Sequence, residues 1–149
     1  MNPNDLYRAV RDQLLDYTKF EQGLIKIIGY PGYPYGDVVA NKKMDYMEWL
    51  ANYTSYPVIK VEGLEIEVPY FTPFAIKDVH LFVHQKYGQS FKWHKDEVNV
   101  YLYVLRGFKR VHVRNKVYNL HPGQGCIIPS GHLHKAVSTQ GTWALSIGY

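Results

Sequence analysis

The second half of the chain is a regular succession of short apolar segments, and this pattern constrains the fold more than any other feature. Glycine, proline and polar residues separate the segments, and several alternate apolar with polar side chains, as half-buried strands do. Eight of them follow one another to the end of the chain: residues 78–85, 89–96, 99–106, 108–114, 116–120, 125–129, 134–139 and 142–149. Eight closely spaced strands predict a β sandwich or barrel.

The first 75 residues have a different pattern. Leu6, Val10 and Leu14 are four apart in residues 2–17, which predicts an amphipathic helix behind asparagines that can cap it. A second amphipathic helix is expected over residues 41–53.

Two further segments complete this part of the chain. Residues 29–37, rich in glycine, proline and tyrosine, are interpreted as an aromatic loop and as the best candidate for a lid. Residues 58–71 alternate like a strand or hairpin. We therefore expect one domain over residues 1–149, with a helical and loop part over 1–75 packed on an eight-stranded core over 76–149.

Composition narrows the setting of the protein. No run of about 18 apolar residues occurs, so no membrane span is expected. The polar N-terminus does not resemble a signal peptide. Cys126 is the single cysteine, and it lies in an apolar run. We interpret it as a small buried hydrophobic residue in a cytoplasmic or otherwise intracellular protein.

Four residues could form a metal site. His94 and Asp96 are two apart on an expected strand and share a face, as do His132 and His134 on another. Two histidines and one carboxylate that meet at one point form the facial triad of non-haem Fe(II) sites. The alternative is that these are hydrogen-bonded polar residues on the wet face of a sheet.

The wider motifs resemble the cupin superfamily, and within it the JmjC and asparaginyl-hydroxylase-like branch of 2-oxoglutarate-dependent oxygenases. In the first motif, Gly88 is followed by five residues and His94, and Gly107 closes it. Asp96 stands where most metal cupins have a second histidine, and Val100 stands where they have a glutamate. These two departures are typical of the His-x-Asp oxygenases.

The second cupin motif lies near the C-terminus. Gly123, Pro129, Gly131 and His134 match it, with Ser138 in place of the usual asparagine. The resemblance implies a mainly β fold, a double-stranded β-helix (the cupin or jelly-roll barrel) with the N-terminal helices packed on it. It also implies that His94, Asp96 and His134 are the metal ligands. His132 then becomes a pocket residue.

The resemblance also implies a site for 2-oxoglutarate. Lys109 should hold the distal carboxylate, and the residue pattern supports this independently, because a lysine sits on the apolar face of its strand. The alternative is a lysine that extends out of the barrel rim. Asn99, Tyr101 and Tyr103 share a polar face that we expect to line the pocket. Phe91 stands where many relatives have a threonine or serine that helps to hold the co-substrate.

The implied activity is that of a dioxygenase that hydroxylates a C–H bond, with Fe(II), 2-oxoglutarate and dioxygen. One alternative is a metal-dependent cupin enzyme without 2-oxoglutarate, in which Lys109 binds the acid group of the substrate. Another is a non-enzymatic cupin-like binding module. The primary substrate stays open between a protein side chain, a small molecule and a nucleobase.

A row of positive residues bears on the partner. Arg110, His112 and Arg114 alternate along one strand and form what we call the outer basic stripe. With a pI near 9.0 it could bind nucleic acid. The net charge of +4 is modest, so we favour an ordinary solvent-exposed face.

Overall fold

The computed structural model of the protein describes residues 2–32, 35–40, 46–47, 56–66, 76–86, 88–89 and 92–149. Two helices, α1 (Pro3–Leu15) and α2 (Tyr17–Glu21), open the chain. Within the described residues eleven strands follow: β1 (Lys26–Gly32), β2 (Tyr35–Ala40), β3 (Val58–Glu62), β4 (Asp78–His84), β5 (Gly88–Gln89), β6 (Val100–Arg106), β7 (Lys109–Val113), β8 (Lys116–Leu120), β9 (Gly125–Ile128), β10 (His134–Ser138) and β11 (Thr142–Gly148).

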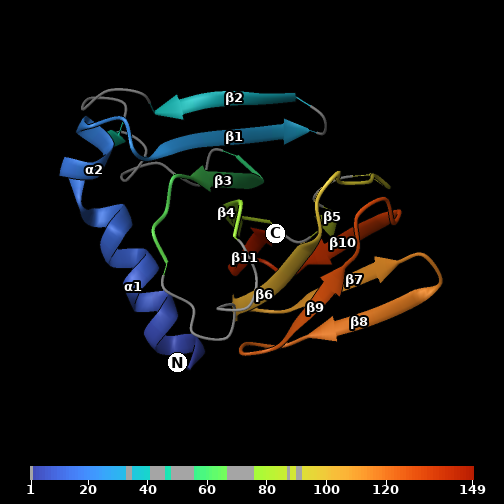
Figure 1. Ribbon diagram of the computed structural model, residues 1–149. Coiled ribbons are helices and arrows are strands. Elements are labelled where there is room, and N and C mark those ends of the chain that lie inside the picture. The colour runs from blue at the N-terminus through green and yellow to red at the C-terminus, as the bar shows by residue number, and fades with distance from the viewer. Residues whose placement is uncertain are drawn as a thin grey trace.

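The strands form two antiparallel sheets that face each other (Figure 1). The larger sheet has the order β2-β1-β3-β4-β11-β6-β9, and the smaller has the order β5-β10-β7-β8. Neighbours in the sheets are often distant in sequence, since β11 pairs with both β4 and β6. This arrangement confirms the predicted class, a mainly β jelly-roll or cupin barrel with helices at the N-terminus.

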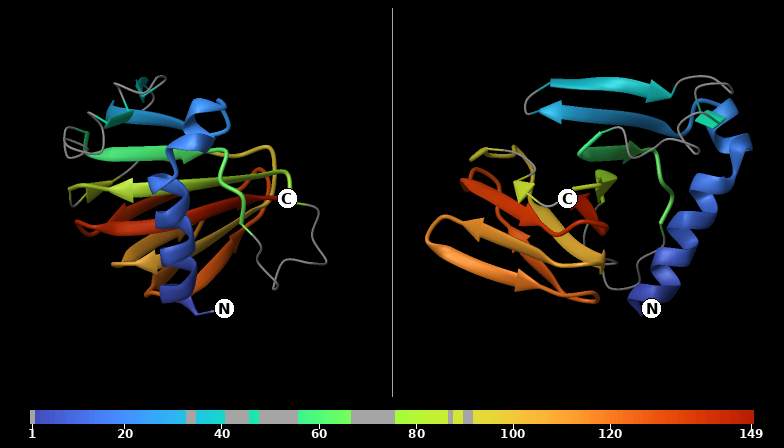
Figure 2. Two further views of the ribbon diagram at one scale, coloured as in Figure 1. Left: turned by 90° about the vertical axis from the view of Figure 1, so that its left-hand side faces the viewer. Right: turned by 180° about the vertical axis from the view of Figure 1, so that it is seen from behind.

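Helix α1 begins and packs as the sequence predicts. The Asn2 side chain accepts a hydrogen bond from the backbone N–H of Asp5 at 2.9 Å, which satisfies one of the free donors of the first turn. Leu6, Val10 and Leu14 are all buried. They form the apolar stripe of the helix, which crosses the strands of the larger sheet (Figure 2).

The larger sheet is buried on both faces, so the protein has two cores. On one face, the stripe of α1 packs against residues of β1, β3, β4 and β11, with Ile59, Leu81 and Leu145 fully buried. On the other face, residues of β6, β9 and β11 meet β7 and β8 inside the barrel, around Val104 and Val111. The pocket described below opens on this second face.

The structure overturns the interpretation of residues 29–37 as a loop. Residues 29–32 belong to β1 and residues 35–37 to β2, and β1 pairs with β3 in register from Lys26 to Tyr30. The physical reason is visible at Gly29, where a Cβ atom would meet the ring of Tyr56. Gly29 leaves room for that ring, so here a glycine is compatible with a strand. The chain therefore adds β1, β2 and β3 to one edge of the barrel.

The expected strand 89–96 is also wrong over most of its described length. Only Gly88–Gln89 forms a strand, β5, and residues 92–99 follow an irregular path with one isolated bridge. The second expected helix, residues 41–53, lies outside the described residues except for 46 and 47, as does the last part of the expected hairpin, from residue 67.

Candidate metal centre and its pocket

The segment that carries His94 and Asp96 is held against the start of β10. The backbone N–H of His94 donates to the carbonyl of His134 at 3.1 Å, and the N–H of His134 donates to the carbonyl of His94 at 2.9 Å. Two residues on, the N–H of Gly131 donates to the carbonyl of Asp96 at 3.0 Å. These hydrogen bonds hold residues 94–96 in place, although the segment forms no regular β strand.

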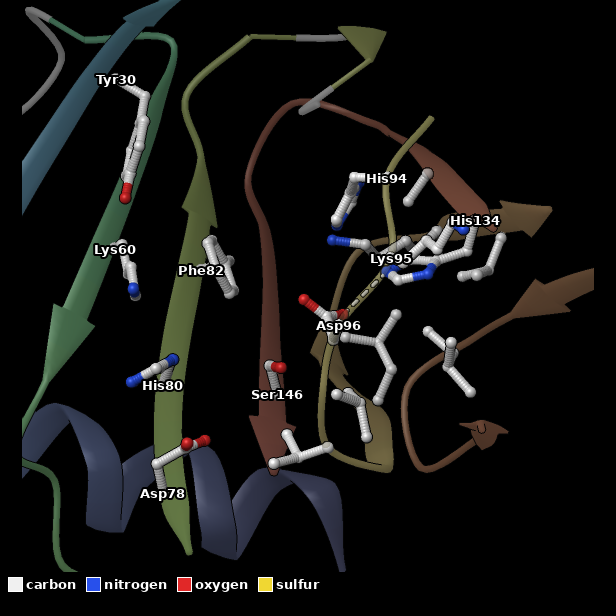
Figure 3. Close-up of a pocket in the computed structure, with 17 residues that line it drawn as sticks. Tyr30, Lys60, Asp78, His80, Phe82, His94, Lys95, Asp96, His134 and Ser146 are labelled. Atoms are coloured by element: carbon white, nitrogen blue, oxygen red, sulfur yellow. Dashed lines mark ion pairs between the residues drawn. The ribbon is translucent and has the colours of Figure 1, made fainter. Parts of the chain in front are cut away.

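Three side chains converge from these two segments (Figure 3). His94, Asp96 and His134 each offer a ligand atom, and the three atoms lie within 4.8 Å of one another. The ring centroids of the two histidines are 4.1 Å apart, and Nε2 of His134 lies 3.1 Å from Oδ2 of Asp96. Ligands bound to one ion at about 2.1 Å lie roughly 3 Å apart, so small adjustments would complete a coordination sphere.

Backbone carbonyls orient both histidine rings. Nδ1 of His94 lies 2.8 Å from the carbonyl of Lys92, and Nδ1 of His134 lies 2.9 Å from the carbonyl of His132. A carbonyl can only accept, so each Nδ1 carries the proton, and Nε2 is the nitrogen that could coordinate a metal. This is the outer-shell hydrogen bond that metal-binding histidines commonly make.

The contact between His134 and Asp96 needs a positive charge. With its proton on Nδ1, a neutral His134 would turn a lone pair toward the carboxylate, and two acceptors would face each other. Burial opposes protonation of His134, yet the hydrogen bond to Asp96 raises its pKa above the ordinary value. The same hydrogen bond lowers the pKa of Asp96. A proton on Nε2 of His134, or a metal cation between the two side chains, would hold the pair together.

These residues therefore fit a divalent metal with imidazole and carboxylate ligands, such as Fe(II). Three protein ligands would leave coordination positions open for other molecules. Among the described residues, these three form the one such cluster of histidine, cysteine, aspartate and glutamate.

The three side chains lie in a pocket of about 490 Å³ between the two sheets. One wall is apolar and belongs to the barrel, with Val100, Leu102, Val111 and Ile128. The opposite wall is polar and aromatic, and it comes largely from β1, β3, β4 and β11 (Figure 3). A volume of this size suits a small ligand or a single side chain.

The polar wall was not predicted as a site. It contains Tyr30, Lys60, His80, Phe82 and Ser146. Its signal was present in the alternation of β3 and β4, where Lys60, His80 and Phe82 all occupy the face that turns toward the barrel interior. The sequence does not predict that β3 lies next to β4, because that pairing joins distant parts of the chain.

Lys109 lies inside the pocket as the apolar face of its strand predicts. The residue is 4% exposed, and burial lowers the pKa of its ammonium group to about 8. Gly107 sets the turn before it, with a φ of +84° and the side chain of Thr142 where a Cβ would stand. No described carboxylate forms an ion pair with Lys109.

The structure places the other predicted co-substrate residues elsewhere. Tyr101 and Tyr103 pack against the core under α1, whereas Val100 and Leu102 face the pocket. The predicted facing of this strand is therefore wrong. Period-two alternation separates two faces but does not say which is inside, and a tyrosine can pack its ring against a helix.

Asn99 has a structural contact and is not among the pocket residues. Its side-chain oxygen accepts a hydrogen bond from the N–H of Ser130 at 3.0 Å, which ties residues 97–99 to the turn before β10. His132 is also absent from the pocket wall and contributes its carbonyl to His134. Phe91 lies outside the described residues.

Comparison with known proteins agrees with this geometry. Residues 81–146 match the Cupin_2 family, described as a cupin domain. This segment contains the strands of the barrel and all three residues of the metal cluster. Residues 81–146 of this chain are thus similar to cupin domains. A search of the curated proteins gives no match.

The solved structures that are similar to this chain have low sequence identity to it. A protein of unknown function from Rhizobium leguminosarum bv. viciae 3841 has a TM-score of 0.51 and 13% identity, covering 69% of this chain and 90% of its own. An RmlC-like cupin from Shewanella frigidimarina NCIMB 400 has a TM-score of 0.46 and 18% identity, covering 62% and 76%. An oxalate decarboxylase variant from Bacillus subtilis has a TM-score of 0.48 and 14% identity, covering 62% and 25%. At 13% identity, the structure from Rhizobium leguminosarum, with its TM-score of 0.51, speaks for the fold alone.

None of the described helices has the length and apolar character needed to cross a membrane.

Proposed function

We propose that the protein is an Fe(II)- and 2-oxoglutarate-dependent oxygenase that hydroxylates a C–H bond of a substrate bound in the pocket. The observation that carries the proposal is the combination of two features in one cavity. A cluster of two histidines and a carboxylate lies there together with Lys109, a buried ammonium group with no described carboxylate partner.

The metal cluster supports the iron part of the proposal. His94, Asp96 and His134 would hold the ion on one side and leave the opposite side to other ligands. The His-x-Asp spacing and the bridge between His94 and His134 bring the three together from two segments. The carbonyls of Lys92 and His132 accept hydrogen bonds from Nδ1 of the two rings, which would leave Nε2 of each ring to bind the metal.

Lys109 supports the co-substrate part. Burying an ammonium group without a counter-ion is costly, so the folded protein favours an anion beside it. A dicarboxylate that chelates the metal through one end could place its other carboxylate at Lys109, where it would form a charge-assisted hydrogen bond. The apolar wall around Val100 and Val111 would exclude water and strengthen that interaction.

The polar wall would bind the primary substrate. Tyr30 and Phe82 offer ring surfaces, and Lys60 and His80 offer polar contacts on the side opposite the metal cluster. When bound, iron with 2-oxoglutarate and dioxygen would supply the oxidation that inserts one oxygen atom into a C–H bond and yields succinate and carbon dioxide. The residues of the chain fix positions and keep the reaction away from solvent.

The test is the stoichiometry of turnover. The iron-loaded protein should consume dioxygen and convert 2-oxoglutarate to succinate, slowly without substrate and faster when a substrate is present. His134→Ala should abolish both. A metal-dependent cupin enzyme without 2-oxoglutarate would give no succinate, and a binding module would consume no dioxygen with any candidate. Either result would reject the proposal.

A further inference from the structure

Charge is distributed unevenly along this chain. All 13 aspartates and glutamates precede residue 98, whereas residues 98–149 contain six lysines and arginines. The last segment forms β6 to β11 and supplies three of the four strands of the smaller sheet. The remaining strand of that sheet, β5, has no acidic residue either. The smaller sheet therefore carries positive charge that no acidic side chain of its own strands balances.

The outer basic stripe lies on the outer face of this sheet. Every second residue of β7 is buried in the barrel, beginning with Lys109. Arg110 and His112 alternate with these onto the outer face, and the exposed Arg114 follows directly after the strand. Nε of Arg110 donates a hydrogen bond to Oδ1 of Asn119 at 2.9 Å, which orients the guanidinium group on the sheet. Both described helices pack on the larger sheet, on the other side of the molecule (Figure 1).

Apolar side chains lie among these charges. The sheet register pairs His112 with Lys135 of β10 on one side and with Val117 of β8 on the other. Val117 is 51% exposed. At the other end of this row lies Trp93, which is 46% exposed. The centroid of its ring lies 6.3 Å from that of His112 and 5.1 Å from Nζ of Lys135. An aromatic ring and an aliphatic side chain thus flank the stripe.

A third apolar side chain borders the stripe. Leu133 is 45% exposed, and its carbonyl accepts a hydrogen bond from the N–H of Arg114 at 2.9 Å. Single exposed apolar residues are ordinary on a protein surface, whereas a group of them among cations indicates a contact surface. Tryptophan and arginine are also enriched at the positions that contribute most to binding in protein interfaces. The face therefore has the composition of an interface as well as its charge.

The spacing of the stripe matches an extended polypeptide. Its members are two residues apart, so they repeat about every 6.8 Å along the strand. Carboxylates at every second position of an extended segment would repeat at the same distance, and each guanidinium group could bind one through paired hydrogen bonds. A nucleic acid would also meet the cations, but its phosphates would then lie against Val117 and Leu133. An acidic polypeptide can offer aliphatic side chains at those points.

We propose that the outer face of the smaller sheet is a docking surface for an extended acidic segment of another protein, bound along β7 by the outer basic stripe and flanked by Trp93 and Val117. The inference does not depend on the proposed function, because no metal or co-substrate takes part in it. Complementary charge speeds encounter and selects acidic partners, and the apolar contacts slow dissociation.

Binding should be measured by fluorescence anisotropy with a labelled peptide of about twelve residues at about 50 mM salt. The peptide has glutamates at alternate positions, a leucine on either side of them and serines elsewhere. It should bind saturably, and its affinity should fall as salt is added, because salt screens exposed charges. The same peptide with glutamine in place of glutamate should not bind.

Variants of the protein locate the binding face. Arg110→Glu with Arg114→Glu should weaken peptide binding at least about 10-fold. Arg8→Glu with Arg11→Glu is the matched control, because it changes the net charge equally on α1, where both side chains are exposed. The control should change the affinity less than about 3-fold. Val117→Ser should weaken the leucine-containing peptide about 3-fold and leave unchanged the affinity for a peptide with serine in place of leucine.

Three results would overturn the proposal. One is the absence of saturable binding of the acidic peptide up to about 1 mM. Another is an equal loss in the two charge-reversed proteins, since the peptide would then respond to net charge alone. The third is tighter binding of single-stranded DNA of matched charge, which would identify a nucleic acid as the partner. If the protein with both glutamates does not fold, Arg110→Gln with Arg114→Gln replaces it, and an unchanged peptide affinity in that protein would also overturn the proposal.

Discussion

Replacing Lys109 with methionine should stabilise the metal-free protein while removing its affinity for 2-oxoglutarate. Burial lowers the pKa of Lys109 from 10.5 to about 8. The folded protein therefore holds the lysine proton less tightly than the unfolded chain does, and the charged form costs stability. A shift of this size corresponds to about 3 kcal/mol at pH 7, where both states are protonated. Methionine has a similar length and no charge to bury.

The sign of the pH dependence follows from the same shift. Between pH 8 and about 10.5 the folded protein loses the proton before the unfolded chain does, so the penalty falls as pH rises. At pH 10 about 1 kcal/mol of the destabilisation by the buried lysine should remain. The stability advantage of Lys109→Met should therefore shrink between pH 7 and pH 10.

Urea unfolding, followed by tryptophan fluorescence at both pH values, measures this advantage. Lys116→Met is the matched control, because Lys116 is exposed on β8. It should change the free energy of unfolding by less than about 0.5 kcal/mol at either pH. A Lys109→Met protein less stable than wild type at pH 7 would refute the reasoning, since it would mean that the ammonium group has a stabilising partner in the folded protein.

Other perturbations address the site and its surroundings. His94→Ala and His134→Ala should each abolish Fe(II) binding in calorimetry without loss of the folded circular dichroism spectrum, whereas His132→Ala should bind iron nearly as wild type because only its carbonyl contacts the site. Tyr103→Phe should leave 2-oxoglutarate affinity within about 2-fold of wild type, because the ring of Tyr103 packs under α1. A large loss of affinity would mean that Tyr103 contacts the co-substrate in the pocket. The affinity for 2-oxoglutarate should fall as pH rises above about 8, where Lys109 loses its proton in the empty pocket. An affinity that does not change with pH would mean that another residue binds the distal carboxylate. The outer basic stripe should show no binding to short single-stranded DNA or RNA at about 50 mM salt in a fluorescence titration, and steeply salt-dependent binding would contradict this.

The features predicted correctly from sequence depend on local patterns. Alternation of apolar residues located β4 and β6 to β11, because each of these strands has at least one face in a core. The spacing of His94 and Asp96, together with the turn before His134, anticipated that three side chains would meet. Their meeting depends on a pair of backbone hydrogen bonds between two segments that the motif resemblance brings together.

The features that were missed depend on contacts between distant parts of the chain. β1 contains Gly29, which argues for a loop until Tyr56 and β3 are seen to pack beside it. The polar wall exists because β3 adds to the edge of the barrel at β4, and no local pattern records that pairing. The inward face of β6 could not be chosen because both faces of that strand are buried, one against α1 and the other inside the barrel.

The most direct test of the central claim is an anaerobic titration of the Fe(II)-loaded protein with 2-oxoglutarate, followed by visible absorption. Chelation of iron by the keto acid should produce a weak visible band that saturates at one equivalent of 2-oxoglutarate per iron. His134→Ala should give no band, and Lys109→Met should give it only at concentrations at least about 30-fold higher. Iron that binds tightly to the wild-type protein and shows no band at any 2-oxoglutarate concentration would contradict the account.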